Sequence, residues 1–320
     1  MRGRSPVSRF LFGLRILIFI VFSAYSGMLF GGSSNHSLYI KSDGSLWGMG
    51  NNSNGQLGDG NTTNKISSAK IEFAGKLFYG GSIKNGMDGI NDLNGSLHII
   101  ISQDGKRLYN SAAIGNSISW FDRNSTTGSL NFNGSIRDGV NGIEDLNGTW
   151  GLALSVDEKY LYASSQYSST VSWFECNSTT GSLSFVGKIK NGLNGMDDLN
   201  GTQIIKFTPD GKHLYVVSGY DNTISWFGQN SASGELTFLG KVKNGVGGVK
   251  SLRQPYQISF SSNGNHAYVS SDGNLTWFDR NSSNGQLIFQ DNYENTMINS
   301  LPGLSISPDE NHIYVSHRAG

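Results

Sequence analysis

Short apolar runs separated by polar turns recur along most of the chain. Thr149 to Ser155 (TWGLALS) is mostly apolar, as expected of a strand covered on both faces. Thr170 to Phe174 (TVSWF) alternates with period two, which is typical of a pleated strand. Tyr160 to Ser164 (YLYAS) and Ser182 to Ile189 (SLSFVGKI) complete the set. This pattern predicts a unit of four antiparallel strands. Beyond residue 30 no window has helical spacing of its apolar positions.

The same unit is written four times with a step of 53 residues. The copies open at Gly81, Gly134, Gly187 and Gly240. Each copy reaches a Trp-Phe pair, at 120–121, 173–174, 226–227 and 277–278. Repeats of this length mark stacked arrays, and four strands in about 50 residues form one blade of a β-propeller. We expect the Trp side chains to pack between blades.

We therefore predict an all-β propeller of about five blades plus a partial one. The expected strands of the first copy lie near 97–102, 107–112, 117–122 and 129–137. The blades are expected at 81–133, 134–186, 187–239 and 240–290, with a partial blade at 291–320. In the last one, 304–307 and 312–316 match strands one and two. Either N-terminal strands complete this last blade and close the ring, or the sequence is a fragment. Closure matters because an open array of sheets exposes strand edges that pair with other chains.

The first 30 residues are of a different kind. Arginines at 2, 4, 9 and 15 precede an apolar run at 16–22. In the following Ala24-Tyr25-Ser26, small residues occupy the two positions that a signal peptidase recognises. This layout predicts a cleaved secretory signal, removed with residues 1–26. An uncleaved membrane anchor over 10–30 and a misassigned start are the alternatives. The protein is accordingly expected to be secreted, periplasmic or at the cell surface, or anchored in a membrane through residues 10–30.

Residues 36–65 resemble one repeat of the RCC1 family. The match is carried by Asp43-Gly44, Trp47-Gly48, Asn52, Gly55-Gln56-Leu57-Gly58 and Gly60. It occurs once, whereas that family's fold needs seven such blades, so its exchange-factor and chromatin functions do not transfer. We expect 31–80 to form a first blade. Its hairpin at 38–47 would correspond to strands one and two of the later repeats, and 76–84 would supply its outer strand.

Residues 77–316 resemble the seven-bladed lactonase-type propeller family. The third copy carries Asn191 to Gly201 (NGLNGMDDLNG), Phe207 to Val216 (FTPDGKHLYV), Ser225-Trp226-Phe227 and Gly234 to Phe238 (GELTF). Members of that family include 6-phosphogluconolactonases and carboxymuconate cyclases. The resemblance implies a propeller whose ligand sits at one mouth of the central channel. It also implies that an enzyme of this type would bring Arg, His and Glu together there, to bind an anionic substrate and move a proton.

First-strand residues near that mouth are the candidates for a site. They are Leu97, Trp150, Gln203 and Tyr256, then His98, Gly151, Ile204 and Gln257. His98 is the candidate catalytic base, although a hydrogen-bonded structural histidine fits the pattern too. Gln203, Gln257 and Arg253 are candidate ligand-binding residues. His213, His266 and His312 share one repeat position before a strand-two Tyr, so we expect them to be scaffold residues.

A carboxylate recurs in the blade-to-blade loops, at Asp92, Asp145 and Asp198. Radial placement would give a ring of oxygen atoms, which are the ligands that Ca²⁺ prefers. The alternative is that Asp and Asn side chains satisfy their own loops as Asx turns. The spacing fits no 12-residue calcium loop, and the fourth copy drops the carboxylate. We therefore expect no cofactor, with Ca²⁺ at these three residues as the alternative.

Charge and cysteine content narrow the functional class. The chain has 24 basic and 24 acidic residues, a balance that argues against a broad nucleic-acid surface. Cys176 is the only cysteine, so no internal disulfide forms, and we expect it at the surface in a turn. No P-loop, G-x-S-x-G, H-E-x-x-H or C-x-x-C motif occurs.

The sequence favours an exported propeller that serves as a binding or interaction scaffold. A lactone hydrolase or cycloisomerase is the second hypothesis, and a cell-surface structural array is the third. The partner is a small molecule, a glycan or a protein. No nucleic acid is expected, and a membrane only through the N-terminal segment.

Overall fold

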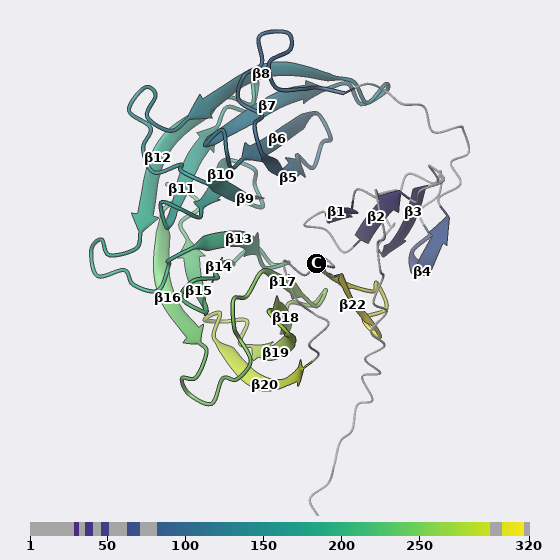
Figure 1. Ribbon diagram of the computed structural model, residues 1–320, viewed down its shortest axis with the longest axis vertical. Helices are drawn as coiled ribbons and strands as arrows, with labels where there is room; N and C mark the ends of the chain where they lie inside the picture. The colour runs from purple at the N-terminus through teal and green to yellow at the C-terminus, as the bar shows by residue number, and fades with distance from the viewer. Residues whose placement is uncertain are drawn as a thin grey trace, which may run out of the picture.

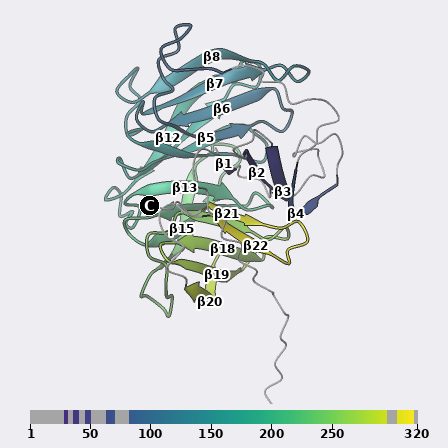
Figure 2. The same cartoon turned by 45° about the vertical axis from the view of Figure 1, so that its right-hand side comes forward.

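The computed structural model describes residues 29–31, 36–40, 46–50, 63–70, 82–294 and 303–316. The regular elements of these residues are all strands. They form five four-stranded antiparallel sheets and one two-stranded sheet. The sheets lie around a common centre, as the face view and the turned view both show (Figures 1 and 2). The predicted all-β propeller architecture is confirmed.

The strands follow the chain, sheet by sheet. The first sheet contains β1 (Leu29–Gly31), β2 (His36–Ile40), β3 (Leu46–Gly50) and β4 (Lys65–Lys70). The second contains β5 (Ser96–Ile101), β6 (Arg107–Ala112), β7 (Ser117–Arg123) and β8 (Leu130–Arg137). The third contains β9 (Thr149–Leu154), β10 (Tyr160–Ser165), β11 (Thr170–Cys176) and β12 (Leu183–Lys190). The fourth contains β13 (Thr202–Phe207), β14 (His213–Ser218), β15 (Thr223–Gln229) and β16 (Leu236–Lys243). The fifth contains β17 (Gln257–Phe260), β18 (His266–Ser271), β19 (Asn274–Arg280) and β20 (Leu287–Glu294), and the sixth contains β21 (Gly303–Ile306) and β22 (Ile313–Ser316).

The strands of the repeats lie within two residues of their predicted bounds. The first strands β5, β9, β13 and β17 face the centre, and the fourth strands β8, β12, β16 and β20 form the outer rim (Figure 1). Each first strand contacts the next one around the ring. A side chain on a first strand is therefore placed either in the core between two blades or beside the centre.

Three of the four repeated Trp side chains pack on a glycine of the neighbouring strand. Trp173 of β11 pairs in register with Gly187 of β12, next to a β-bulge. A Cβ atom at Gly187 would overlap the indole ring, so only glycine lets the ring lie flat on the backbone. The pairs Trp120–Gly134 and Trp226–Gly240 repeat this contact. This close approach explains the glycines that open the second, third and fourth copies.

The main apolar cores lie between blades. Trp173 and Tyr162 pack against Ile205, Val216 and Phe227, which belong to the next sheet. Equivalent clusters join the second sheet to the third and the fourth to the fifth. The expectation that the Trp side chains pack between blades is confirmed. Since each of these three clusters takes residues from two sheets, neighbouring blades stabilise one another.

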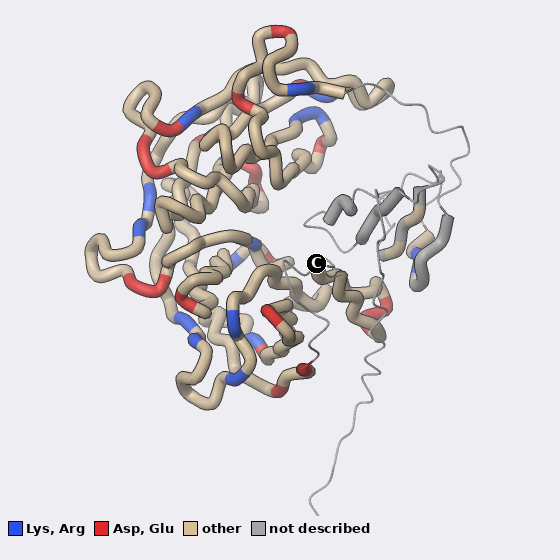
Figure 3. The backbone as a smooth tube through the Cα atoms, in the orientation of Figure 1, with Lys and Arg blue, Asp and Glu red and all other residues tan. Residues whose placement is uncertain are grey.

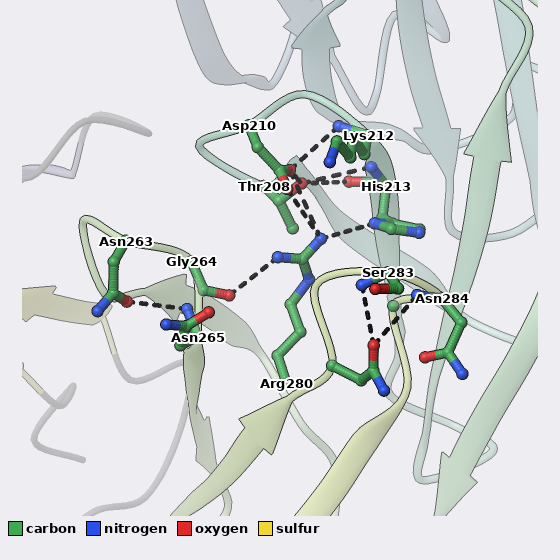
Figure 4. A network of polar contacts seen from close by, with 12 residues as sticks. Thr208, Asp210, Lys212, His213, Asn263, Gly264, Asn265, Arg280, Ser283 and Asn284 are labelled. Carbon is green, nitrogen blue, oxygen red and sulfur yellow. Dashed lines mark hydrogen bonds and ion pairs between the residues drawn. The ribbon is translucent and has the colours of Figure 1, made fainter.

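A buried arginine joins the fourth and fifth sheets through polar contacts (Figure 4). The Arg280 side chain is fully buried, with 0% of its surface exposed. Its Nη1 donates to the Gly264 carbonyl at 2.9 Å and its Nε to the Tyr215 hydroxyl at 3.1 Å. Its Nη2 lies 2.6 Å from Nδ1 of His213 and 3.5 Å from the Asp210 carboxylate. Burial, followed by the charge of Arg280, lowers the pKa of His213, so His213 accepts this hydrogen bond in its neutral form.

Cys176 occupies the repeat position of Arg280, and its location differs from the prediction. The side chain is half-buried and packs against the core between the second and third sheets. Burial raises the pKa of its thiol to about 12. The expectation of a surface residue in a turn was wrong: Cys176 is the last residue of β11 and packs against the preceding blade, a contact that the local sequence alone does not reveal.

The sheet that contains the RCC1-like segment differs from the prediction in its strand order. The hairpin of β2 and β3 forms its two central strands, with β1 paired to β2 and β4 paired to β3. The hairpin therefore does not correspond to strands one and two. The outer strand is β4 at Lys65–Lys70, whereas residues 82–84 form no strand and 71–81 lie outside the described residues.

The predicted signal or anchor falls outside the described residues up to residue 28. Its last predicted residues, Leu29 and Phe30, belong to β1. Within the described part of the chain, no helix is long and apolar enough to cross a membrane.

Candidate functional site

The four residues predicted at the mouth of the channel sit at one repeat position, but their surroundings differ. Leu97 is exposed, Trp150 and Tyr256 are half-buried, and Gln203 is buried. The Tyr256 hydroxyl lies 3.2 Å from Oε1 of Gln254. The position thus carries apolar, aromatic and amide side chains, and no charged group repeats there.

His98 lies on β5 beside the neighbouring first strand. Its Nδ1 accepts a hydrogen bond from the Leu152 backbone N–H at 3.2 Å. Burial, with a smaller contribution from the positive charge of Lys206, lowers the pKa of His98 to about 4. The ring is therefore neutral near pH 7, and its proton resides on Nε2 because Nδ1 is the acceptor. In this arrangement His98 offers a hydrogen-bond donor and no free lone pair for a base.

Lys206 is the site residue that sequence reasoning missed. It is half-buried on β13, and its Nζ lies 3.5 Å from the Ser259 hydroxyl of β17. Burial lowers the pKa of this amine to about 8. Aligning the repeats would have found it, since the same position holds Ile100, Ala153 and Ser259 in the other copies.

No hydrogen bond or ion pair within the described part of the chain joins His98 to the candidate ligand-binding residues Gln203, Gln257 and Arg253. The Gln203 side chain is 4% exposed, and its Oε1 has no hydrogen-bond partner among the described residues. Gln257 is half-buried and pairs in register with Ser270. Arg253 is exposed, and its carbonyl accepts the backbone N–H of Asp272 at 2.9 Å. These three residues keep their proposed ligand role as a prediction.

The repeated loop carboxylates face cations of the following outer strand. Asp145 lies 2.6 Å from both Lys188 and Lys190. Partial burial raises the pKa of Asp145, but hydrogen bonds from the two lysines outweigh it and hold the pKa below its usual range. Asp198 is held in the same way by Lys241 and Lys243. Figure 3 shows basic residues along the outer rim with acidic residues beside them.

Asp92 faces Ser135 and Arg137 at the two positions where the later copies carry lysines. Its carboxylate accepts a hydrogen bond from Ser135 at 2.5 Å and lies 3.7 Å from Arg137. Within the described ranges, no three His, Cys, Asp or Glu side chains are grouped so that they could hold a metal ion. A Ca²⁺ ion at these three residues stays a prediction, and it would compete with the basic side chains.

The blade-to-blade loops are stabilised by an Asn or Asp at the start of each loop, and not by the repeated carboxylates. Asn191 accepts the Leu199 N–H at 3.0 Å, and the same contact recurs at Asn85–Leu93, Asp138–Leu146 and Asn244–Leu252. In each loop, the side-chain oxygen of this first residue accepts a hydrogen bond from the backbone N–H eight positions later. The loop backbone is thereby satisfied from within the loop. The repeated carboxylates instead form ion pairs.

Two family models match the sequence. The model for the seven-bladed β-propeller lactonase matches residues 61–196 and 194–320. A model for the regulator of chromosome condensation (RCC1) repeat matches residues 31–56. Both resemblances expected from the sequence are confirmed. No curated protein gives a match.

Several solved structures share the fold at low sequence identity. A candidate 6-phosphogluconolactonase from Bacteroides uniformis is 14% identical, with a TM-score of 0.58 over 91% of this chain and 74% of that one. A protein from Lactobacillus plantarum is 15% identical, with a TM-score of 0.55 over 88% and 71%. The periplasmic gluconolactonase of Pseudomonas aeruginosa is 19% identical, with a TM-score of 0.53 over 81% and 63%.

Proposed function

The chain belongs to the seven-bladed β-propeller lactonase family, and from this premise we propose that it is an exported propeller that binds a ligand without hydrolysing it. The bound partner would occupy the inner strands, where the copies differ most from one another. The repeated parts of the chain are used for packing, as the Trp–Gly contacts and the loop hydrogen bonds illustrate. A recognition surface needs residues that the repeat leaves free.

The observation that carries this proposal is the state of His98. A general base must have a free lone pair within reach of the proton that it removes. Nδ1 of His98 is engaged by the Leu152 N–H, and Nε2 carries the proton. A pKa of about 4 also makes the ring a poor base near pH 7. His98 is therefore suited to holding β5 against β9 and to donating one hydrogen bond.

A lactone hydrolase is the second candidate function, and Lys206 is the observation that favours it. With a pKa of about 8, a fraction of this amine is uncharged near neutral pH and able to accept a proton. It lies on the same ring of first strands as His98. Family membership alone does not decide between the two candidates, because one fold serves many activities.

We expect no hydrolysis of 6-phosphogluconolactone or of a simple δ-lactone above the rate in buffer. The measurement is a pH-stat assay near pH 7 on the wild type and on His98→Gln and Lys206→Met. His98→Gln is a mild change because Gln257 occupies the equivalent position of the fourth copy. A wild-type rate that disappears in His98→Gln would overturn the proposal. A rate that survives in His98→Gln and disappears in Lys206→Met would establish the second candidate.

Export is the other part of the proposal, and it rests on the three-part layout of residues 1–26. We expect secreted material to begin close to residue 27. Mass spectrometry of the N-terminal peptide from culture medium, periplasm and membranes decides this. An intact N-terminus found in the membrane fraction would favour the anchor instead.

A further inference from the structure

Lys206 on the inner strand β13 differs from the paired lysines of the outer strands β12 and β16. Lys188, Lys190, Lys241 and Lys243 all lie within 2.6 Å of an Asp carboxylate. Lys206 has no carboxylate within ion-pair distance among the described residues, and its near polar neighbour is the Ser259 hydroxyl. An ammonium group that is partly removed from water without a counter-charge is unfavourable. The repeat does not require it, since Ile100 and Ala153 occupy the same position.

The polar groups near this amine are neutral and can each donate a hydrogen bond to a ligand. The Ser259 hydroxyl of β17 accepts from Nζ of Lys206 at 3.5 Å and keeps its own proton to donate, and the neutral His98 ring carries its proton on Nε2 on the far side of β9. The charge of Lys206 reaches His98, since it contributes to the low pKa of that ring. Three first strands thus supply one cation and two neutral donors to the inner side of the propeller. Among the described residues, no carboxylate accompanies this set.

We propose that Lys206, with Ser259 beside it and His98 across β9, binds a small oxyanion, the carboxylate or phosphate group of a ligand held at the inner strands. A charge-assisted hydrogen bond from the ammonium group to an anionic oxygen is stronger than a neutral one. The anion would supply the counter-charge that the protein does not. This inference rests on the proposed function, because it assigns a chemical class to the ligand that the propeller binds.

The test is isothermal titration calorimetry with inorganic phosphate and with gluconate, at pH 7 and constant ionic strength. Glucose is the neutral control. Lys206→Met removes the charge and keeps most of the side-chain volume, and Lys212→Met is the matched control because Lys212 is exposed on the next turn. We expect binding of phosphate, gluconate or both to weaken at least about tenfold in Lys206→Met, the effect of losing about 1.4 kcal/mol. Lys206→Arg should retain most of the affinity, and Lys212→Met should equal the wild type.

The pH dependence gives a second readout. Because Lys206 is charged below a pKa of about 8, wild-type affinity should fall as the pH rises from 7 to 9.5. His98 stays neutral over this range, and Ser259 does not titrate. Phosphate changes its own charge near pH 7, so gluconate is the probe for this series. The thermal midpoint of ligand-free Lys206→Met should equal or exceed that of the wild type, since the substitution removes an unpaired charge.

The anions that bind, and their dependence on Lys206, decide the inference. Binding of phosphate alone assigns a phosphate group, and binding of gluconate alone assigns a carboxylate. Anion binding that is equal in Lys206→Met and wild type, or no anion binding to a folded wild type, overturns the inference. Turnover in the lactone assay together with Lys206-dependent anion binding would reject the proposed function and leave the anion site intact.

Discussion

Replacing Trp173 with alanine is expected to lower the free energy of unfolding by about 3–5 kcal/mol. The indole ring is 6% exposed and packs against the next blade. Its other face lies on Gly187, so the space left behind is walled by a strand backbone and by a second sheet. Neither wall can close the cavity without moving a whole blade. The loss should therefore lie at the upper end for a buried aromatic side chain.

Trp277→Ala is the matched control for this prediction. In the fourth copy Asp291 replaces the glycine opposite the ring, and Trp277 is only half-buried. The alanine variant should lose clearly less stability than Trp173→Ala. Urea denaturation followed by tryptophan fluorescence and by circular dichroism measures both. A loss below about 1 kcal/mol for Trp173→Ala would mean that the ring is exposed, and a role in stacking on a ligand would then replace the packing role.

Arg280→Met is expected to lower the free energy of unfolding by about 3 kcal/mol, as breaking a buried charged network does. The substitution leaves the Gly264 carbonyl without its donor at 2.9 Å and leaves Nδ1 of His213 unpaired. It also removes the donor to the Tyr215 hydroxyl, which keeps its own hydrogen bond to the Gly285 carbonyl. Since these groups belong to two sheets, their loss weakens the contact between blades as well as the local turn (Figure 4).

Arg123→Met tests whether the network, and not any arginine at this repeat position, provides the stability. Arg123 occupies the same position in the first copy and donates to the Gly105 carbonyl at 2.9 Å. It is half-buried, so its substitution should cost about 1 kcal/mol. Equal losses for the two variants in the same denaturation experiment would contradict the interblade role of Arg280.

The sequence was sufficient to predict most of the propeller, because the repeat writes the same pattern four times. Strand bounds in the third sheet were predicted from alternation and turn residues, and β9 to β12 lie where TWGLALS, YLYAS, TVSWF and SLSFVGKI place them. The Trp pairs also predicted the interblade core correctly. The first sheet was harder, since it is no copy of the repeat. There the hairpin of β2 and β3 could not be assigned as outer or central strands without its neighbours.

Side-chain partners explain what the sequence could not show. Asp145 and Asp198 look like a ring of oxygen ligands until the lysines 43 and 45 positions later are seen to meet them. Cys176 was expected in a surface turn, yet it ends β11 and packs against the core shared with the preceding blade. In the sequence Lys206 is one more lysine in a strand. Its candidate role in anion binding follows from the structure, where no carboxylate among the described residues pairs with it. Such contacts join segments far apart in sequence, so local patterns do not encode them.

Binding and turnover by this propeller are measured most directly in one calorimetric trace. A δ-lactone is injected into the wild-type protein near pH 7, and the heat of its spontaneous hydrolysis in buffer is subtracted. We expect brief binding peaks that diminish as the site fills, with a baseline that returns to its starting level after each injection. A baseline that shifts and stays displaced in proportion to protein concentration is the signature of continuing hydrolysis. That result would contradict the claim that this propeller binds its ligand without reacting with it.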